Sequence, residues 1–451
     1  MTIPPADQGS TDSSKPAFLA DPPPPLAGFP AEEFRARRER LQAAFPVSVV
    51  VIRGSREDEF GGANVYRQNS SFFYLTGVET PGAFLVLLPD SLPARTGLRD
   101  APLEVKEILF LPARNATTET WTGPQLGPDE TTEKLTGIQK ASDASGFLSA
   151  VVGWIRRCPS VATLTPYGDN AATSREYALM QQIGKQAPAV QFSDVAMALA
   201  RQRAVKSELE IDRIRQAIAI TSEGQQAARS MIASGAGTWE YEIEAKIFQT
   251  FRSRGATLAF ASIVGGGQRG TVLHYEKNSQ QLQNGDLVVV DIGAKIGGYC
   301  GDLTRSYPVG GAFSPRQREI YSLVLDAHER TIASYRPGED TLKSISDRCK
   351  EFLKDSPLRS RNEKGEEATM NHFMPHGLSH HLGLDVHDAG DPEEPLAPGN
   401  VITVEPGLYL PSESIGVRIE DDYLVTAAGL ERLGPPLEKE TSAVEAAMRG
   451  V

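Results

Sequence analysis

Two acidic residues, Asp291 and Asp302, stand inside strand-forming sequence, and few folds accommodate such a pair. Four apolar residues, 287–290, lead directly into Asp291, the pair Gly297-Gly298 favours a turn, and Asp302 begins a second apolar run. This pattern predicts a β-hairpin. If Asp291 pairs with Asp302, the loop falls at Ile296-Gly297 and the two carboxylates lie opposite each other on adjacent strands.

Two facing carboxylates repel each other unless a cation lies between them, and Asp is depleted in strand interiors. The pair therefore indicates a site for a hard metal ion. For this hairpin alone, the alternative is that one Asp caps a turn while the other is exposed to solvent.

A second hairpin repeats the arrangement. The run 401–410 carries Glu405, and the run 415–425 carries Glu420. Pairing these two glutamates places the centre of the hairpin at Ser412-Glu413, within a turn-like segment. Four carboxylates on two hairpins indicate a metal site strongly, because burying each charge would otherwise be costly. The neighbours Asp421 and Asp422 are expected to be solvated.

Histidines supply the third element, since five of the seven lie between residues 372 and 387. His376 and His380 have the spacing of a helical zinc pair, but Gly377 stands where that motif needs Glu. One imidazole with four carboxylates favours Mn, Fe, Co or Zn in a two-ion cluster. The histidines expected to be core or surface residues are His328, His372 and His381.

The glycine-rich segment 265–270 lacks the Gly-Lys-Ser/Thr sequence of a nucleotide-binding loop. Residues 271–275 instead predict a strand that presents His274 at its start. No Gly-x-Ser-x-Gly sequence occurs, and Cys300 between the two aspartates is expected to be a packing residue, so covalent catalysis fits poorly.

The chain divides into three parts by composition. Residues 1–30 hold eight of the 31 prolines and predict a flexible arm. Strand and helix patterns over 31–198 predict a small α/β domain, and alternating helices and hairpins predict a second domain over 199–440. Expected strands cover 48–53, 72–75, 83–88, 108–112 and 161–166; expected helices cover 34–45 and 147–157, and others begin at Ser207 (with Glu210), Thr238 and Ser314.

The charge balance of −12 excludes an overall basic surface for nucleic acid or anionic lipid. No apolar run approaches the roughly 20 residues needed to cross a bilayer, and no secretory signal is readable at the start, so a cytoplasmic location is expected. Three scattered cysteines predict reduced thiols rather than disulfides.

The second half resembles the pita-bread metallopeptidases, specifically the aminopeptidase P and prolidase family, and the first half resembles the amino-terminal domain of aminopeptidase P. The resemblance spans about Ala31 to Leu433. The segments that carry it are Asp291-Ile-Gly-Ala, Gly301-Asp-Leu-Thr-Arg305, His376-Gly-Leu-Ser-His380, Gly383-Leu-Asp-Val-His387-Asp388, Val404-Glu-Pro-Gly-Leu-Tyr409, Val417-Arg-Ile-Glu-Asp421, Tyr66–Gly77 and Glu119–Gly127.

The resemblance implies an α/β (α+β) architecture, with a pita-bread catalytic domain preceded by a smaller α/β domain. It implies two divalent ions, usually manganese, whose bridging hydroxide is the nucleophile. Its implied metal ligands are Asp291, Asp302, His380, Glu405 and Glu420, with Asp302 and Glu420 shared by both ions. Its other implied roles are a proton shuttle (Glu405), orientation of substrate and stabilisation of the oxyanion (His274, His387), and lining of the substrate subsites (His376, Tyr409, Arg418).

The activity implied is hydrolysis of the Xaa-Pro bond at peptide N-termini by a homo-oligomer, a dimer or tetramer. Two alternatives remain, an Xaa-Pro dipeptidase and an inactive pita-bread protein that binds peptides. The intact ligand set argues against the inactive protein, and Ser379 and the Trp121 motif favour an aminopeptidase over a dipeptidase. His381 and Gln125 depart from the family pattern, where a larger aromatic and an Arg are expected.

Overall fold

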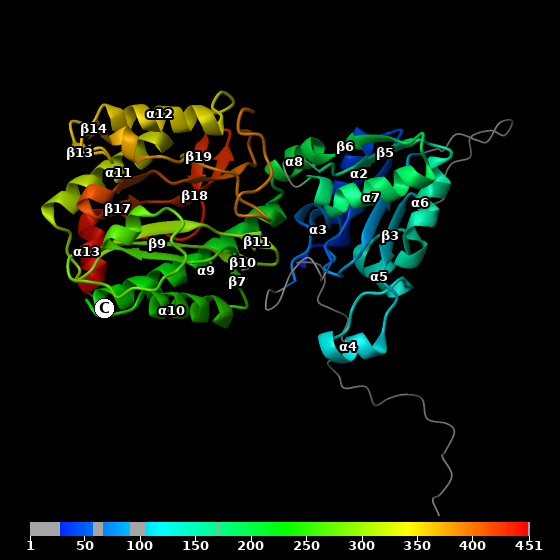
Figure 1. Cartoon of the computed structure of the whole chain (residues 1–451), viewed down its shortest axis with the longest axis horizontal. Coiled ribbons are helices and arrows are strands. Elements are labelled where there is room, and N and C mark those ends of the chain that lie inside the picture. Colours follow the sequence, from blue (N-terminus) through cyan, green and yellow to red (C-terminus); the bar gives the residue numbers. More distant parts are fainter. Residues whose placement is uncertain (1–27, 57–65, 91–104, 167, 169–170, 450–451) are drawn as a thin grey trace, which may run out of the picture. The chain divides into compact units, whose positions relative to one another are not determined.

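The computed structural model describes residues 28–56, 66–90, 105–166, 168 and 171–449, and the chain divides into two compact units, Met1–Ala198 and Leu199–Val451 (Figure 1). Both units mix helices and strands, which agrees with the predicted α/β (α+β) class. Within the described ranges, no helix is long and apolar enough to cross a membrane.

The first unit is built on one mixed sheet of six strands in the order β4-β3-β2-β1-β5-β6. Apolar residues of the central strands pack against α6 and α7 to form its core. The strands are β1 Val49–Arg53, β2 Phe84–Leu87, β3 Glu107–Leu111, β4 Lys140–Asp143, β5 Ser160–Thr163 and β6 Gln191–Asp194. The helices are α2 Ala31–Ala44, α3 Ser70–Thr76, α4 Ala116–Thr122, α5 Glu130–Thr136, α6 Phe147–Ile155, α7 Arg175–Gln186 and, at the unit boundary, α8 Ala196–Ala204.

The strand predicted over 72–75 is wrong, because these residues lie in the helix α3. The Asn69 side chain accepts a hydrogen bond from the Phe72 backbone N–H and so caps the helix start. Gly77 adopts a left-handed conformation at the other end. These two end signals outweigh the aromatic, strand-like composition between them.

The predicted arm extends too far at its carboxyl end. Residues 1–27 lie outside the described residues, but Phe29 is buried and its ring packs against the Phe34 ring and the Arg37 guanidinium. Phe29 therefore belongs to the first unit rather than to an arm.

The second unit places α9 and α10 on one side of its strands and α11 and α12 on the other (Figure 1). Its apolar core joins these helices to the strands of both acid-bearing hairpins. The helices are α9 Glu208–Ala233, α10 Glu240–Ser253, α11 Pro315–Ala333, α12 Leu342–Lys354 and α13 Thr441–Arg449. The strands are β7 Thr257–Leu258, β8 Ile263–Gly266, β9 Leu287–Ile292, β10 Ala294–Ile296, β11 Tyr299–Cys300, β12 Leu303–Pro308, β13 Arg359–Arg361, β14 Glu367–Thr369, β15 Val401–Val404, β16 Gly407–Leu410, β17 Ile415–Arg418, β18 Asp421–Thr426 and β19 Gly429–Arg432.

The first acid-bearing hairpin exists, but its predicted register is wrong by two residues. Thr304, not Asp302, lies opposite Asp291. The turn is Gly297-Gly298, where both residues have positive φ, so the register follows from a glycine pair that can form the tight turn. Because the shift is two residues, it preserves the strand face on which each side chain lies.

The second hairpin has the predicted register. Gly407 pairs with Arg418, and Val404 pairs with Asp421. Glu405 and Glu420 fall between these two pairs and are matched by the same register. The short helix η7, Pro411–Glu413, forms the turn where the sequence centred it.

Two local predictions in the second unit need correction. The strand predicted over 271–275 is absent, since Gly267–Thr271 forms a 3-10 turn (η5). The buried Glu240 carboxylate accepts hydrogen bonds from the Gly266 N–H and the Tyr275 hydroxyl, and these contacts hold the segment without strand pairing. The predicted cap Thr238 is also displaced, because Trp239 directly precedes α10. The capping pair predicted for Ser207 and Glu210 and the helix start predicted at Ser314 are confirmed.

We expect Gly301→Ala to destabilise the second unit by about 1–3 kcal/mol. A Cβ at Gly301 would lie 2.7 Å from the Ile218 backbone N and 2.9 Å from the Ala217 carbonyl carbon, and a helix backbone cannot move aside easily. Gly153→Ala, where a Cβ meets nothing within 4 Å, is the matched control. Urea denaturation of both variants checks this expectation, and equal stability of the two variants would contradict it.

Candidate metal centre

Three of the predicted ligands converge. Asp302, His380 and Glu420 each offer a ligand atom, and these atoms all lie within 4.8 Å of one another. His380 Nε2 is also 3.6 Å from Asp302 Oδ2 and 3.5 Å from Glu405 Oε1. Asp302 belongs to the first acid-bearing hairpin, and Glu405 and Glu420 belong to the second. The site therefore joins both hairpins to the histidine segment.

Main-chain contacts fix the histidine segment against the second hairpin. The Thr403 N–H donates to the His380 carbonyl, and the Glu405 N–H donates to the Leu378 carbonyl. The His380 ring places Nδ1 3.0 Å from the His381 carbonyl. Nε2 is therefore the ring nitrogen that faces the carboxylates.

Asp291 lies in β9 beside this cluster. One of its carboxylate oxygens, Oδ2, accepts a hydrogen bond from Arg418. Its other oxygen, Oδ1, is buried and has no hydrogen-bond partner among the described residues, and the same holds for Asp302 Oδ1. Buried oxygens without partners are costly, and a bound cation would satisfy them. The residues present therefore fit a metal with oxygen ligands and one imidazole.

The electrostatics of the cluster have two opposite consequences. Burial, with repulsion from neighbouring carboxylates, raises the pKa of Asp302 and of Glu405 well above the usual range, and raises the pKa of Glu420 to about 8. Burial lowers the pKa of His380 to about 4, which keeps its imidazole neutral. A neutral imidazole is the form that binds metal. Without a cation, by contrast, the carboxyl groups retain protons.

The predicted subsite residues form one hydrogen-bonded chain that ends on Asp291. Arg418 Nη1 donates to the Tyr409 hydroxyl at 2.7 Å, and this hydroxyl lies 3.1 Å from His376 Nε2. Burial lowers the pKa of His376 to about 4 and raises that of Tyr409 to about 12. Arg418 is buried, whereas His376 is more exposed.

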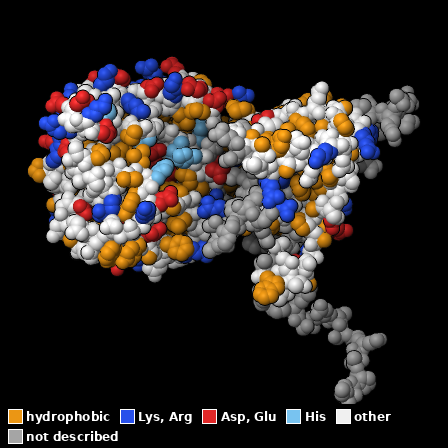
Figure 2. Space-filling model, in the orientation of Figure 1, with side chains coloured by type: hydrophobic (Ala, Val, Ile, Leu, Met, Phe, Trp, Pro, Cys, Tyr) orange, Lys and Arg blue, Asp and Glu red, His pale blue; other side chains and the backbone are white. Residues whose placement is uncertain are grey.

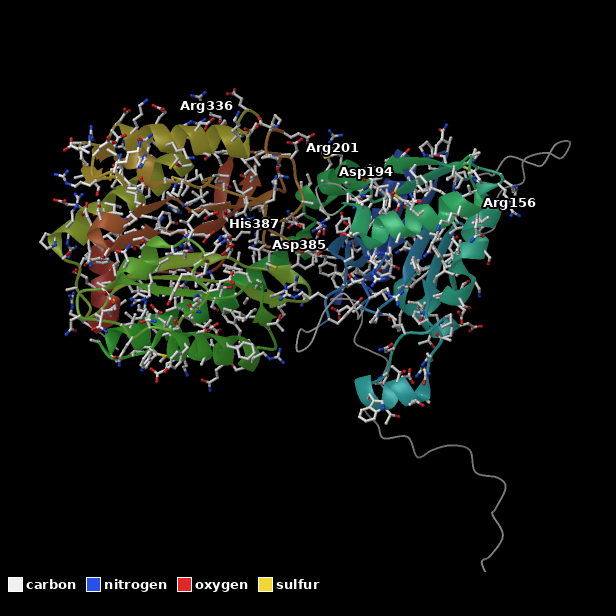
Figure 3. All side chains as sticks on the ribbon, viewed as in Figure 1. Arg156, Asp194, Arg201, Arg336, Asp385 and His387 are labelled. Carbon is white, nitrogen blue, oxygen red and sulfur yellow. The ribbon has the colours of Figure 1, made fainter. Side chains whose placement is uncertain are left out.

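His387 and His274 lie at the exposed side of the site. The His387 ring stacks on the His380 ring with centroids 4.2 Å apart. Partial burial, with a smaller contribution from the nearby His274, lowers the pKa of His387. Histidine side chains gather together on the visible surface of the second unit (Figure 2), and His387 is labelled there in Figure 3.

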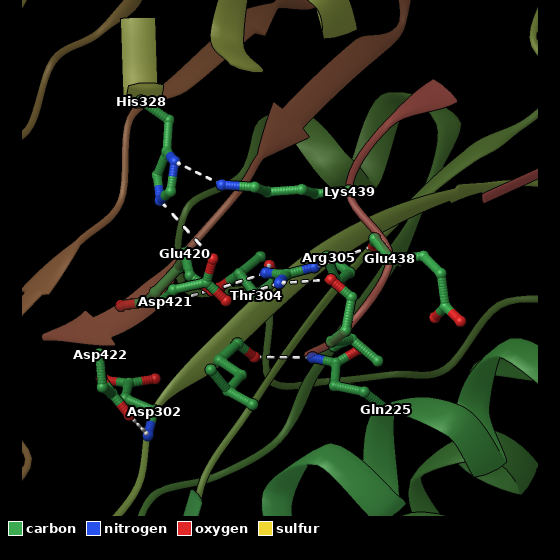
Figure 4. A network of polar contacts seen from close by, with 12 residues as sticks. Gln225, Asp302, Thr304, Arg305, His328, Glu420, Asp421, Asp422, Glu438 and Lys439 are labelled. Carbon is green, nitrogen blue, oxygen red and sulfur yellow. Dashed lines mark hydrogen bonds and ion pairs between the residues drawn. The ribbon is translucent and has the colours of Figure 1, made fainter. Parts of the chain in front are cut away.

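The prediction that Asp421 and Asp422 are solvated is wrong, since both are buried. Asp422 Oδ2 accepts the backbone N–H of Asp302 at 3.0 Å, and Asp421 pairs with Arg305 at 2.6 Å (Figure 4). Strand β18 is covered on both faces, so side-chain alternation does not expose either carboxylate.

Sequence reasoning also missed Thr304, whose hydroxyl contacts Glu420, and Asp388, which pairs with Arg203 and Lys206. The side chains of Thr304 and Asp388 are both fully or nearly fully buried. The residues expected to be core or surface groups are found in such positions. Cys300 and His328 are fully buried, His381 is buried, and His372 is exposed and lies close to Glu363.

Known proteins match both halves of this chain. Residues 212–427 match metallopeptidase family M24, and residues 34–161 match the aminopeptidase P N-terminal domain. The Xaa-Pro aminopeptidase of Escherichia coli (strain K12) is 33% identical, with 92% of this chain and 97% of the relative covered. The Xaa-Pro aminopeptidase of Haemophilus influenzae is 34% identical, with 93% and 98% covered.

Solved structures give the same result. Proline aminopeptidase P II from Yersinia pestis superimposes with a TM-score of 0.80 and 30% identity, covering 94% of this chain and 100% of that one. Aminopeptidase P from E. coli with the inhibitor Pro-Leu also gives a TM-score of 0.80 and 30% identity, covering 94% and 99%. Both the sequence and the fold thus match over nearly the full length.

We expect Asp302→Ala and Glu420→Ala to abolish tight binding of divalent metal, because each removes a converging ligand atom. Cys300→Ser, in the same hairpin, should bind metal like the unchanged protein, because Cys300 is a buried packing residue. Metal content after dialysis and titration calorimetry with Mn²⁺ check this expectation. Loss of metal in the cysteine variant alone would contradict the ligand assignment.

We also expect the chelated protein to lose stability as the pH rises from about 7 to about 8. The carboxyl groups with raised pKa values hold protons that the unfolded chain releases, so unfolding releases protons and its free energy falls with rising pH, by up to about 1.4 kcal/mol per pH unit for each proton. In this window the histidines with lowered pKa values are neutral in the folded protein. Urea midpoints with EDTA check the slope, which Glu420→Gln should reduce; a rising midpoint would contradict it.

Proposed function

This chain belongs to metallopeptidase family M24 and is a metal-dependent Xaa-Pro aminopeptidase, and we propose that five of its residues hold the metal. The convergence of Asp302, His380 and Glu420 within 4.8 Å is the observation that carries this proposal. The proposed ligands are Asp291, Asp302, His380, Glu405 and Glu420.

Two divalent ions are proposed for this site, with manganese as the native metal. Four carboxylates and one imidazole form a donor set that suits Mn²⁺. Zinc is the competing ion, since one matching structure is of a Zn-substituted E. coli aminopeptidase P in complex with product. When bound, such ions lower the pKa of water and polarise a carbonyl group.

Glu405 is the proposed proton shuttle. Its side chain is 17% exposed, compared with 6% for that of Asp302, so it is the more accessible carboxylate. The Glu405 backbone N–H donates to the Leu378 carbonyl, which fixes the main chain at this residue. The carboxylate is proposed to move a proton between the attacking water and the leaving amine.

His274 and His387 are proposed to contact the substrate. Both are exposed, and the lowered pKa of His387 keeps its imidazole neutral at neutral pH. A neutral ring can donate one N–H to the developing oxyanion, a contact generally worth about 3 kcal/mol in the transition state. His376 and Tyr409 are proposed to line the adjacent subsite.

The burial and hydrogen bonds of Arg418 support an aminopeptidase over a dipeptidase. A dipeptidase must bind a free carboxylate directly after proline, and an arginine is the usual group for that. Here Arg418 is buried, and Nε, Nη1 and Nη2 already donate to Thr304, Tyr409 and Asp291. The substrates proposed are therefore peptides that continue beyond proline.

The two units are proposed to act as separate domains, 31–198 and 199–440, with the second domain holding all of the proposed ligands. The homo-oligomer of two or four copies and the cytoplasmic location stay predictions.

We expect kcat/KM to be higher for Xaa-Pro-Xaa tripeptides than for Xaa-Pro dipeptides. The assay uses chelated protein reconstituted separately with Mn²⁺, Co²⁺ and Zn²⁺, and Mn²⁺ should give the highest or nearly the highest rate. Efficient cleavage of dipeptides alone would identify a prolidase. Full activity in a sample shown to be free of metal would overturn the metal assignment.

A further inference from the structure

Thr304 is fully buried in β12, opposite Asp291 and two residues after Asp302. Its hydroxyl lies 2.6 Å from Glu420 Oε2 and 3.1 Å from Arg418 Nε. Thr304 and Glu420 appear together in Figure 4. One hydroxyl therefore contacts both a proposed metal ligand and the arginine beneath the proposed substrate subsite.

The direction of these two hydrogen bonds is fixed by chemistry. A guanidinium has donors and no acceptor, so the Thr304 oxygen must accept from Arg418. The single hydroxyl hydrogen is then directed to Glu420, whose carboxylate accepts it. The bond from Arg418 has a charged donor, and the bond to Glu420 has an ionised acceptor when a metal ion is bound, so each is then stronger than a bond between neutral groups.

The main chain holds Thr304 in register with Glu420. The Thr304 carbonyl accepts the Glu420 N–H at 3.1 Å, and it also accepts Arg305 Nη1 at 2.9 Å. Arg305 Nη1 in turn donates to the Glu420 carbonyl at 2.6 Å. A β-branched side chain on this fixed backbone has few rotamers, so the hydroxyl has a defined position relative to the Glu420 carboxylate.

We propose that Thr304 is a positioning residue that orients the Glu420 carboxylate for metal binding and the Arg418 guanidinium for the Tyr409 subsite. The proposal rests on the proposed function, because it takes Glu420 as a ligand and Tyr409 as a subsite residue. Through one hydroxyl, metal affinity and substrate affinity share a common structural support. Residues that hold metal ligands from behind generally change metal affinity by 10- to 100-fold when lost.

The test compares Thr304→Val, which keeps the shape and removes the hydroxyl, with Thr304→Ser, which keeps the hydroxyl. Thr331→Val is the matched control, since Thr331 is also fully buried and its hydroxyl donates to the Ala327 carbonyl within α11 rather than to a proposed metal ligand. Chelated proteins are titrated with Mn²⁺ by calorimetry, and kcat and KM for an Xaa-Pro-Xaa tripeptide are measured at saturating Mn²⁺.

We expect Thr304→Val to weaken Mn²⁺ binding by about 10- to 100-fold and to raise KM at saturating Mn²⁺. Thr304→Ser should restore both values, and Thr331→Val should change neither. Melting temperatures of the chelated proteins separate this effect from misfolding. If Thr304→Val does not fold, Thr304→Ala and Thr304→Ser replace it as a pair, because they differ only in the hydroxyl.

Unchanged Mn²⁺ affinity and KM in a folded Thr304→Val protein would overturn the role of Thr304 while leaving the proposed function intact. An equal defect in Thr304→Ser would overturn it too, because the methyl group rather than the hydroxyl would then matter. If the unchanged protein itself bound no Mn²⁺, the proposed function would fail, and the role of Thr304 would fail with it.

Discussion

Repulsion among buried carboxylates is the interaction on which the second unit depends. Asp302 and Glu420 lie close enough to share an ion and are almost fully removed from water, and their neighbours add further negative charge. Without a cation such a cluster holds its protons, which is the state that the raised pKa values describe. The scaffold must therefore hold like charges together before any ion arrives, and the surrounding contacts serve that purpose.

Two buried arginines provide this support. Arg418 donates to Asp291 beside the cluster, and Arg305 pairs with Asp421, the residue after Glu420. Arg305 also donates to the carbonyls of Glu420, Leu437 and Glu438, so it joins the second hairpin to the segment that precedes α13. His328 and Lys439 complete this network (Figure 4), which extends the structural support of the site towards the end of the chain.

Much of the second unit could be predicted from sequence because its information is local. The register of the second hairpin follows from one turn and two strand runs, and the capping pair of Ser207 and Glu210 identifies the start of α9. The predicted register of the first hairpin was wrong by two residues, because the choice between a turn at Ile296-Gly297 and one at Gly297-Gly298 depends on which residues take positive φ. The burial of Asp421 and Asp422 could not be predicted, since it depends on Arg305 and on a backbone N–H more than 100 residues away.

Residues at the exposed side of the site are held in place differently from those in its buried centre. His387 is open to solvent, as a residue that contacts substrate must be, yet the next residue is fixed: Asp388 accepts a hydrogen bond from Arg203 and lies 3.3 Å from Lys206 Nζ. Both cations come from the residues just before α9, and Lys206 is buried. Two cations facing one buried carboxylate hold the backbone beside His387 firmly, while the imidazole itself stacks on the ring of His380. Precision at the exposed side is thus achieved through the main chain, whereas in the buried centre it is achieved through the side chains themselves.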